Sequence, residues 1–131
     1  MPYPADLKYT KEHEWIKVDG SSATIGITDY AQDSLGDIVF VDLPKTGSEI
    51  TAGKTFGTVE SVKAVSDLYA PATATVTEVN GELATAPEKI NKDANGTWMI
   101  KVTLKNPVEL NGLLSAADYE KFVSEEGRGV A

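Results

Sequence analysis

The sequence contains no cysteine and only one histidine, His13. The absence of cysteine excludes disulfides, thiol nucleophiles and metal sites built from thiolates. A single histidine argues against a His-rich metal centre and against a conventional histidine-based catalytic triad. We therefore expect no metal site, and the common enzyme classes that depend on these residues are poor explanations of the chain.

Positive charge is also scarce. Twelve basic side chains stand against 20 acidic ones, which gives a net charge of −8, and Arg128 is the sole arginine. Nucleic-acid binding needs a basic patch to neutralise phosphates, and an anionic membrane surface would repel this chain. The sequence therefore predicts partners that are neither nucleic acids nor membranes.

Long apolar runs are missing as well. The longest aliphatic and aromatic run is IVFV at 38–41, far too short to span a bilayer, and the first 15 residues have neither an apolar core nor an Arg-rich amphipathic pattern. We expect a cytoplasmic protein, or a mitochondrial matrix protein if the chain is a mature eukaryotic one.

What the chain does contain is a series of short β-prone stretches separated by turns. Its 131 residues, 41% hydrophobic and 24% charged, fit one domain with a modest core. ATIGI at 23–27 has period-two alternation, and DIVFVDL at 37–43 is typical of a buried strand. The sequence predicts a mainly β fold in which two small antiparallel sheets form a sandwich.

Two helices are expected outside the sheets. Thr28 can cap a short helix that ends at Gly36, and Ser115 can cap a longer helix with an apolar stripe that includes Tyr119. We predict a single domain over 1–131, with a β core at about 15–105 and a C-terminal helix at 115–126.

Lys63 lies alone between two predicted strands, KTFGTVES and VSDLYA. A solvated hairpin lysine is the commonest case. A catalytic lysine needs burial or a neighbouring cation, whereas Glu60 and Asp67 are carboxylates that favour the charged form. The third possibility is a modification site on a protruding turn. Spacing alone does not decide between the first and the third.

Four motifs in order resolve this choice: HEW, GITDYAQ, GDIVFVDLP and ESVKA, followed by YAP. Together they resemble the H protein family of the glycine cleavage system over nearly the whole chain. The resemblance implies a lipoyl-domain-like barrel-sandwich hybrid in which Lys63 carries covalent lipoate. It also implies a carrier protein that is not itself an enzyme.

The family's role implies several partners. The lipoyl arm would carry an aminomethyl group from the glycine decarboxylase, a pyridoxal-phosphate enzyme, to the tetrahydrofolate-dependent aminomethyltransferase. Dihydrolipoamide dehydrogenase would reoxidise it, and a lipoate ligase or lipoyltransferase would install it. The resemblance suggests Glu60, Val62 and Ala64 for ligase recognition and the turn, and Glu14 and Asp67 for a cleft that receives the loaded arm.

Two departures from the family pattern stand out. Ala74 occupies a position where the family often has glycine, and the loop at 93–96 lacks the family's proline and aromatic residue. Two other functions remain open at this stage: a relay that donates lipoyl groups to other lipoyl-dependent complexes, and an enzyme that uses Lys63 as a nucleophile. Neighbouring genes or copurified partners would separate the carrier from the relay, and an altered Lys63 pKa in the unmodified protein would favour the enzyme.

Overall fold

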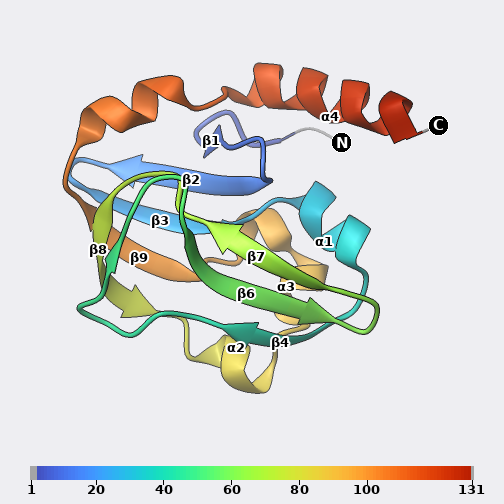
Figure 1. The fold of residues 1–131 in the computed structure, drawn as a ribbon, viewed down its shortest axis with the longest axis horizontal. Coiled ribbons are helices and arrows are strands. Elements are labelled where there is room, and N and C mark those ends of the chain that lie inside the picture. The colour runs from blue at the N-terminus through green and yellow to red at the C-terminus, as the bar shows by residue number, and fades with distance from the viewer. Residues whose placement is uncertain (1–2, 131) are drawn as a thin grey trace.

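Nine strands form two antiparallel sheets in the computed structural model, which describes residues 3–130 and the side chains of residues 3–125 (Figure 1). The larger sheet has the order β1-β2-β3-β9-β8-β5, and the smaller has the order β4-β6-β7. The larger sheet consists of β1 (Lys8–Tyr9), β2 (Glu14–Asp19), β3 (Ser22–Ile27), β9 (Ile100–Leu104), β8 (Ala74–Val79) and β5 (Glu49–Ile50). The smaller consists of β4 (Ile38–Asp42), β6 (Thr55–Ser61) and β7 (Val65–Tyr69).

Helices cover the edges of the two sheets. They are α1 (Asp29–Leu35), α2 (Glu82–Thr85), α3 (Lys89–Lys92) and α4 (Ala116–Val130), with 3₁₀ turns η1 (Ala94–Gly96) and η2 (Pro107–Gly112). The mainly β fold of two antiparallel sheets, with an early and a C-terminal helix, is thus confirmed. The sheets start at Lys8, before the expected start at 15, and α4 extends beyond 126. No helix within residues 3–130 is long and apolar enough to cross a membrane.

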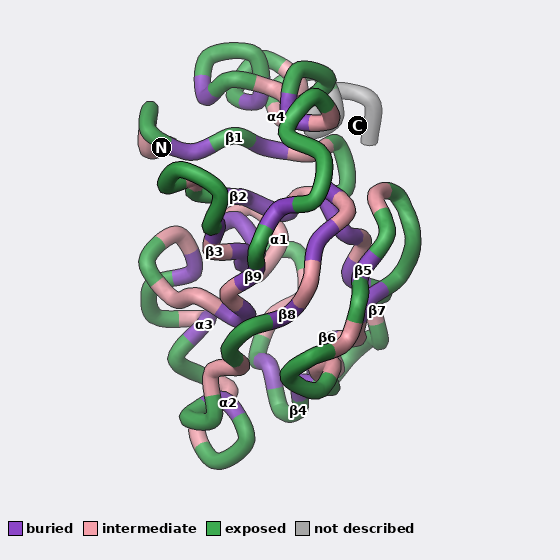
Figure 2. Tube along the Cα trace, turned by 90° about the vertical axis from the view of Figure 1, so that its left-hand side faces the viewer, coloured by how far each residue is buried: buried purple, intermediate pink, exposed green. Residues whose placement is uncertain are grey.

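The main core fills the space between the sheets, where most buried segments lie (Figure 2). Ile25 from the larger sheet and Val59 from the smaller one are both 0% exposed. Ala23, Ile25 and Ile27 are all buried, as their alternation predicted. Burial of the inward faces is the principal favourable term that holds such a sandwich together.

The prediction that 37–43 forms a buried strand was wrong for its middle. Val39 is 53% exposed and Phe40 is 49% exposed. The pairing of β4 with β6 shifts between Ile38 and Phe40, so an extra residue is inserted there. A β-bulge of this kind lets two consecutive side chains face the same side, which pattern reading does not foresee.

The departure at Ala74 causes no backbone strain. Ala74 is 0% exposed at the start of β8, where it pairs with Leu104. Among the described residues, His13 is the one non-glycine with positive φ, so Ala74 occupies ordinary strand conformation. The loop at 93–96 forms η1, whose Ala94 carbonyl accepts a hydrogen bond of 3.0 Å from the Trp15 indole N–H.

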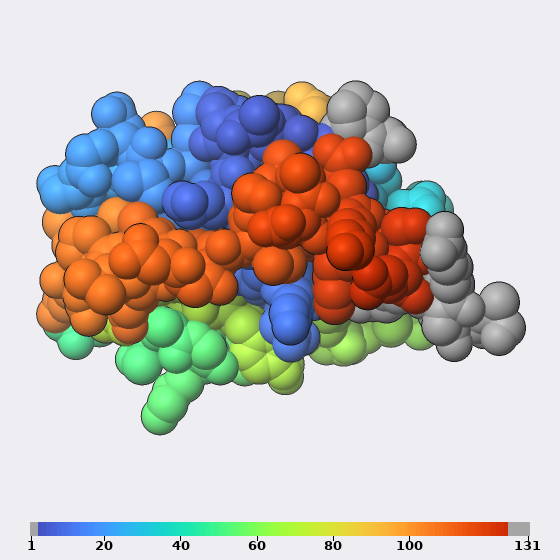
Figure 3. Space-filling model, turned by 90° about the horizontal axis from the view of Figure 1, so that it is seen from above, coloured from blue at the N-terminus to red at the C-terminus, as the bar shows by residue number. Residues whose placement is uncertain are grey.

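A second apolar cluster joins α4 to the N-terminal segment. Ser115 caps α4 as predicted, because its Oγ accepts from the Asp118 N–H at 3.2 Å. Tyr119 is fully buried and stacks on Tyr9 with ring centroids 4.7 Å apart. Figure 3 looks down on this face and shows α4 lying against the N-terminal residues.

Candidate functional site

Lys63 is exposed on the tight turn that joins β6 to β7, at the position the sequence predicted. Ser61 builds this turn. Its N–H donates to the Ala64 carbonyl at 2.8 Å, and its Oγ accepts from the N–H groups of Lys63 and Ala64 at 3.3 and 3.1 Å. The Ser61 hydroxyl thus stabilises a tight turn that lacks the Asn-Gly pair common in such turns.

The turn is fastened to the chain that leaves α1 (Figure 1). The Val62 N–H donates to the Asp37 carbonyl at 3.1 Å. A Cβ built on Gly36 would lie 3.8 Å from Cε of Lys63, so the lysine stem passes over the C-terminal end of α1. The Asn91 side chain in turn donates to the Gly36 carbonyl at 2.8 Å. The turn that presents Lys63 is therefore bonded to the segment after α1, and Asn91 holds that segment in place.

A surface pocket of about 220 Å³ lies next to this base. Ser34 and Leu35 in its wall directly precede Gly36, and Ser66 follows Lys63 by three residues. The full lining is Glu12, His13, Tyr30, Ala31, Ser34, Leu35 and Ser66. The wall thus combines apolar surface, a carboxylate and hydroxyl groups within reach of a group attached to Lys63.

His13 is a half-buried part of this wall with an uncommon backbone conformation, φ = 72°. Its Nδ1 lies 2.7 Å from the Tyr119 hydroxyl, and its ring packs against Tyr30 with centroids 4.6 Å apart. Positive φ raises the conformational energy of a non-glycine residue, so the surrounding contacts must stabilise His13 in this conformation. These contacts fix the loop before β2 that carries Glu12.

Glu14 lies beneath the surface and not in the pocket wall, with 1% of its surface exposed. Its carboxylate accepts from the Thr10 hydroxyl at 2.6 Å and from the Tyr69 N–H at 3.1 Å. Burial raises the pKa of this carboxyl to about 7, and the two hydrogen bonds partly oppose that rise. Glu14 therefore ties the start of β2 to β7.

The remaining residues suggested by the sequence lie around the turn. Asp67 is exposed, and because successive strand residues face opposite sides, it points away from Ser66 and the pocket. Glu60 is half-buried on β6, and Val62 and Ala64 are exposed on either side of Lys63. The structure thus gathers Glu60, Val62 and Ala64 at Lys63. It does not bring Glu14 and Asp67 together, because Glu14 is buried against Tyr69 and Asp67 is exposed.

Sequence reasoning missed Ser61, Glu12 and Tyr30. A serine two residues before an exposed turn residue is a recognisable local signal, because its hydroxyl competes for nearby backbone N–H groups. No comparable signal pointed to Glu12 or Tyr30. Their place in the wall depends on how α1 packs beside the loop before β2.

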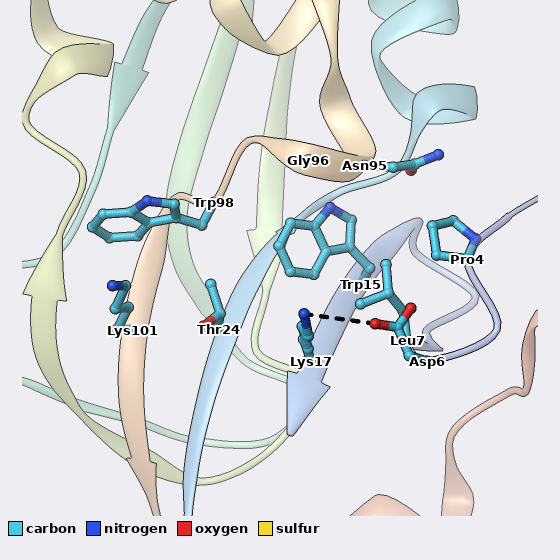
Figure 4. A pocket seen from close by; sticks show the side chains of 10 residues that line it. All are labelled: Pro4, Asp6, Leu7, Trp15, Lys17, Thr24, Asn95, Gly96, Trp98 and Lys101. Atoms are coloured by element: carbon cyan, nitrogen blue, oxygen red, sulfur yellow. Dashed lines mark ion pairs between the residues drawn. The ribbon is translucent and has the colours of Figure 1, made fainter. Parts of the chain in front are cut away.

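A larger cavity of about 400 Å³ lies on the outer face of the larger sheet (Figure 4). Two tryptophans line it, Trp15 and Trp98, and the Lys101 ammonium lies 4.7 Å from the Trp98 ring centroid. Lys17 and Asp6 form an ion pair of 3.6 Å at its edge. None of its lining residues belongs to the β6–β7 hairpin or to α1, so it is separate from the lysine site.

Comparison with known proteins shows the family of this chain. The sequence profile of the family described as "Glycine cleavage H-protein" matches residues 7–126. The chain is 70% identical to the glycine cleavage system H protein of Koribacter versatilis, over 96% of this chain and 98% of that one. It is 63% identical to the protein of the same name from Acidobacterium capsulatum, again over 96% and 98%.

A solved structure supports the same assignment. The crystal structure of a glycine cleavage system H protein from Mycobacterium marinum superposes with a TM-score of 0.82 at 37% identity, covering 95% of this chain and 98% of that one. Matches of this extent and identity leave the family in no doubt. The chain belongs to the glycine cleavage H-protein family, the lipoate-carrying component of the glycine cleavage system that is not itself an enzyme.

Proposed function

We propose that this chain carries lipoate in amide linkage on Lys63 and shuttles an aminomethyl group in the cytoplasm. The group would pass from the pyridoxal-phosphate glycine decarboxylase to the tetrahydrofolate-dependent aminomethyltransferase, with reoxidation by dihydrolipoamide dehydrogenase. The observation that carries the proposal is an exposed Lys63 on a turn held by Ser61 and fastened to Asp37, in a chain of this family.

The lysine fits a covalent arm. Its stem passes Gly36, and the Ser61 hydroxyl accepts two hydrogen bonds from the turn beneath it, so an attached group would swing from a hydrogen-bonded turn. When bound, lipoate would supply a disulfide able to accept the aminomethyl group, and it would be a dithiol only after that group has been passed on. The protein contributes tethering, which replaces diffusion of a free carrier by a high local concentration at each partner.

We propose that the pocket beside Lys63 receives the loaded arm between partners. Ala31 and Leu35 provide apolar wall for the hydrocarbon part of the arm, and Glu12 provides a carboxylate for the amine. A carboxylate that accepts from an ammonium forms a charge-assisted hydrogen bond, stronger than one between neutral groups. Exclusion of water from the amine would slow hydrolytic loss of the group.

Glu14 and Asp67 stay predictions as direct partners of the amine. The burial of Glu14 suggests a second way to act, because its bond to the Tyr69 N–H holds β7 against β2 beneath the pocket. Asp67 is exposed on the outer face of β7, where an arm attached to Lys63 could still contact it. Neutral variants of these residues are compared with a Glu12 variant in the Discussion.

The test of the carrier role is peptide mapping of protein purified from its native host. Trypsin cannot cleave after an acylated lysine, so modification would join residues 55–63 and 64–89 in one peptide with a single lipoyl-sized mass addition. A Lys63→Arg variant keeps the charge but cannot form the amide, and it should be inactive in reconstituted glycine cleavage. An unmodified Lys63 in lipoate-replete cells would refute the proposal.

A further inference from the structure

We infer that an apolar strip beside Lys63 is the docking surface for the enzyme that acylates this lysine. The strip consists of Val39 and Phe40 on β4, Glu60 on β6, and Val62 and Val65 at the turn. The inference rests on the proposed function, since it concerns the enzyme that would install the arm.

Exposed apolar residues are concentrated around the turn. Among the residues whose side chains are described, the exposed large hydrophobics are Val39 (53%), Phe40 (49%), Val62 (71%), Val65 (65%) and Val108 (69%). All but Val108 belong to the strip. Single exposed apolar side chains are ordinary on a protein surface, but a contiguous group marks an interaction site.

Strand register places three members of the strip side by side. Phe40 pairs with Glu60, and Glu60 pairs with Val65, so these three side chains form a row across the outer face of the smaller sheet. Directly paired residues on neighbouring strands share a face and lie about 5 Å apart. The row ends at the turn that presents Lys63.

The β-bulge in β4 enlarges the strip. It inserts Val39 between Ile38, which pairs with Ser61, and Phe40, which pairs with Glu60. Ile38 remains buried while both following side chains face solvent. Regular alternation after the buried Ile38 would have exposed Val39 and turned Phe40 inward, so the bulge provides a second exposed apolar group that core packing does not use.

The next row on the same face carries negative charge. Asp42 and Asp67 both pair with Thr58 and lie one row further along the strands, about 7 Å from the apolar row. No ion pair within the described side chains involves Asp42, Asp67 or Glu60. A partner that fits this face therefore presents an apolar patch bordered by lysine or arginine.

The acylating enzyme is the occupant that the geometry favours. In its reaction the Nζ amine of Lys63 attacks the carbonyl carbon of an activated lipoyl donor, an acyl-adenylate or an acyl thioester. The amide bond forms, the adenylate or thiolate leaves, and Nζ gives up a proton. Only the length of one lysine side chain separates Cα from the reacting carbon, so this enzyme must contact the surface around the turn. Enzymes that act on the finished arm can meet the protein from further away.

The experiment measures acylation of unmodified protein by a purified lipoate ligase with ATP and lipoate. Phe40→Ser should lower kcat/KM about tenfold, as expected for loss of one buried anchor in an interface. Val65→Thr keeps the β-branched shape and should lower it severalfold. Val108→Ser is the matched control, equally apolar and exposed but outside the strip, and it should stay within about twofold of the parent.

Two further measurements separate docking from folding and from the proposed function. Thermal unfolding and the rate of Lys63 acetylation by a small activated ester should be unchanged in Val65→Thr, since neither needs a protein partner. Equal kcat/KM for Val65→Thr, Phe40→Ser and Val108→Ser would overturn the docking inference while the carrier role stood. Failure of the parent protein to be acylated at all would instead count against the proposed function.

Discussion

The Glu14 carboxylate and the Tyr69 main-chain N–H are joined by a hydrogen bond of 3.1 Å across the space between the two sheets. Glu14 starts β2 of the larger sheet, and Tyr69 ends β7 of the smaller one. The same carboxylate is also bonded to the Thr10 hydroxyl at 2.6 Å. One buried acid therefore links the loop before β2, the larger sheet and the hairpin that presents Lys63.

Replacing Glu14 by glutamine should flatten the pH dependence of stability. Burial raises the folded-state pKa of this acid from 4.5 to about 7, so the folded state binds more protons than the unfolded state between these values. Stability is then greatest at low pH and falls as pH rises from about 4.5 to 7, by up to about 3 kcal/mol. Urea unfolding at pH 5 and pH 8 should show this loss in the parent and not in Glu14→Gln. Parallel losses in the two proteins would contradict the role of Glu14.

Removing the hydroxyl of Tyr119 should destabilise the protein. This hydroxyl lies 2.7 Å from Thr28 Oγ1 and 2.7 Å from His13 Nδ1, and both tyrosine and threonine are 0% exposed. Tyr119→Phe keeps the stacked ring but leaves buried polar atoms short of a partner, which costs about 1–3 kcal/mol. Chemical denaturation measures the change. Tyr69→Phe is the control, because the Tyr69 hydroxyl has no hydrogen bond among the described residues. A similar loss of stability there would contradict the role of the Tyr119 hydrogen bonds.

Substitution of Gly36 should destabilise the backbone beside Lys63. Gly36 has φ = 78° and ψ = −154°, a region that only glycine enters readily, while an added Cβ would have ordinary spacing from Lys63. Gly36→Ala should therefore cost about 1–3 kcal/mol through the backbone alone. Gly81 offers a matched control, because its φ is −65° and nothing lies within 4 Å of an added Cβ. Gly81→Ala should be neutral or slightly stabilising; equal destabilisation by both would contradict this reasoning.

The sequence could predict the features of this fold that depend on local signals. The cap at Thr28, the helix start at Ser115 and the turn at Lys63 all follow from short-range chemistry, and each is present. Alternation at 23–27 identified inward-facing residues for the same reason. Lys63 itself could be assigned a role only through resemblance, because a solvated lysine is the commonest case and spacing alone does not distinguish it from a modified one.

What could not be predicted depends on contacts between distant segments. The bulge that exposes Phe40 arises from the register of β4 against β6, which no run of apolar letters encodes. The burial of Glu14 follows from its meeting with Tyr69, 55 residues away. Glu12 joins the pocket wall only because α1 packs beside its loop. Local sequence is silent on such encounters, so the site's carboxylates were the least predictable part.

The contributions of Glu12, Glu14 and Asp67 to retention of the aminomethyl group can be ranked from the rate at which loaded variants lose it by hydrolysis. Glu12 lines the pocket beside Lys63, whereas Glu14 lies beneath it and Asp67 faces away from it. Neutralising the residue that pairs with the amine should speed release about tenfold, the equivalent of one charge-assisted hydrogen bond. We expect the largest increase in Glu12→Gln, measured as ammonia released in the absence of the aminomethyltransferase.

The release rates of the Glu14 and Asp67 variants distinguish a carboxylate that pairs with the amine from one that only holds β7 in place. Glu14→Gln should speed release less than Glu12→Gln at neutral pH, because it loosens β7 without removing a charge that the pocket presents. Glu88→Gln is the control, as Glu88 is exposed and makes no capping bond on α3. Faster release from Glu14→Gln or Asp67→Asn than from Glu12→Gln would move the amine's partner out of the pocket wall. The arm would then rest against β7, and the pocket beside Lys63 would no longer be its receptor.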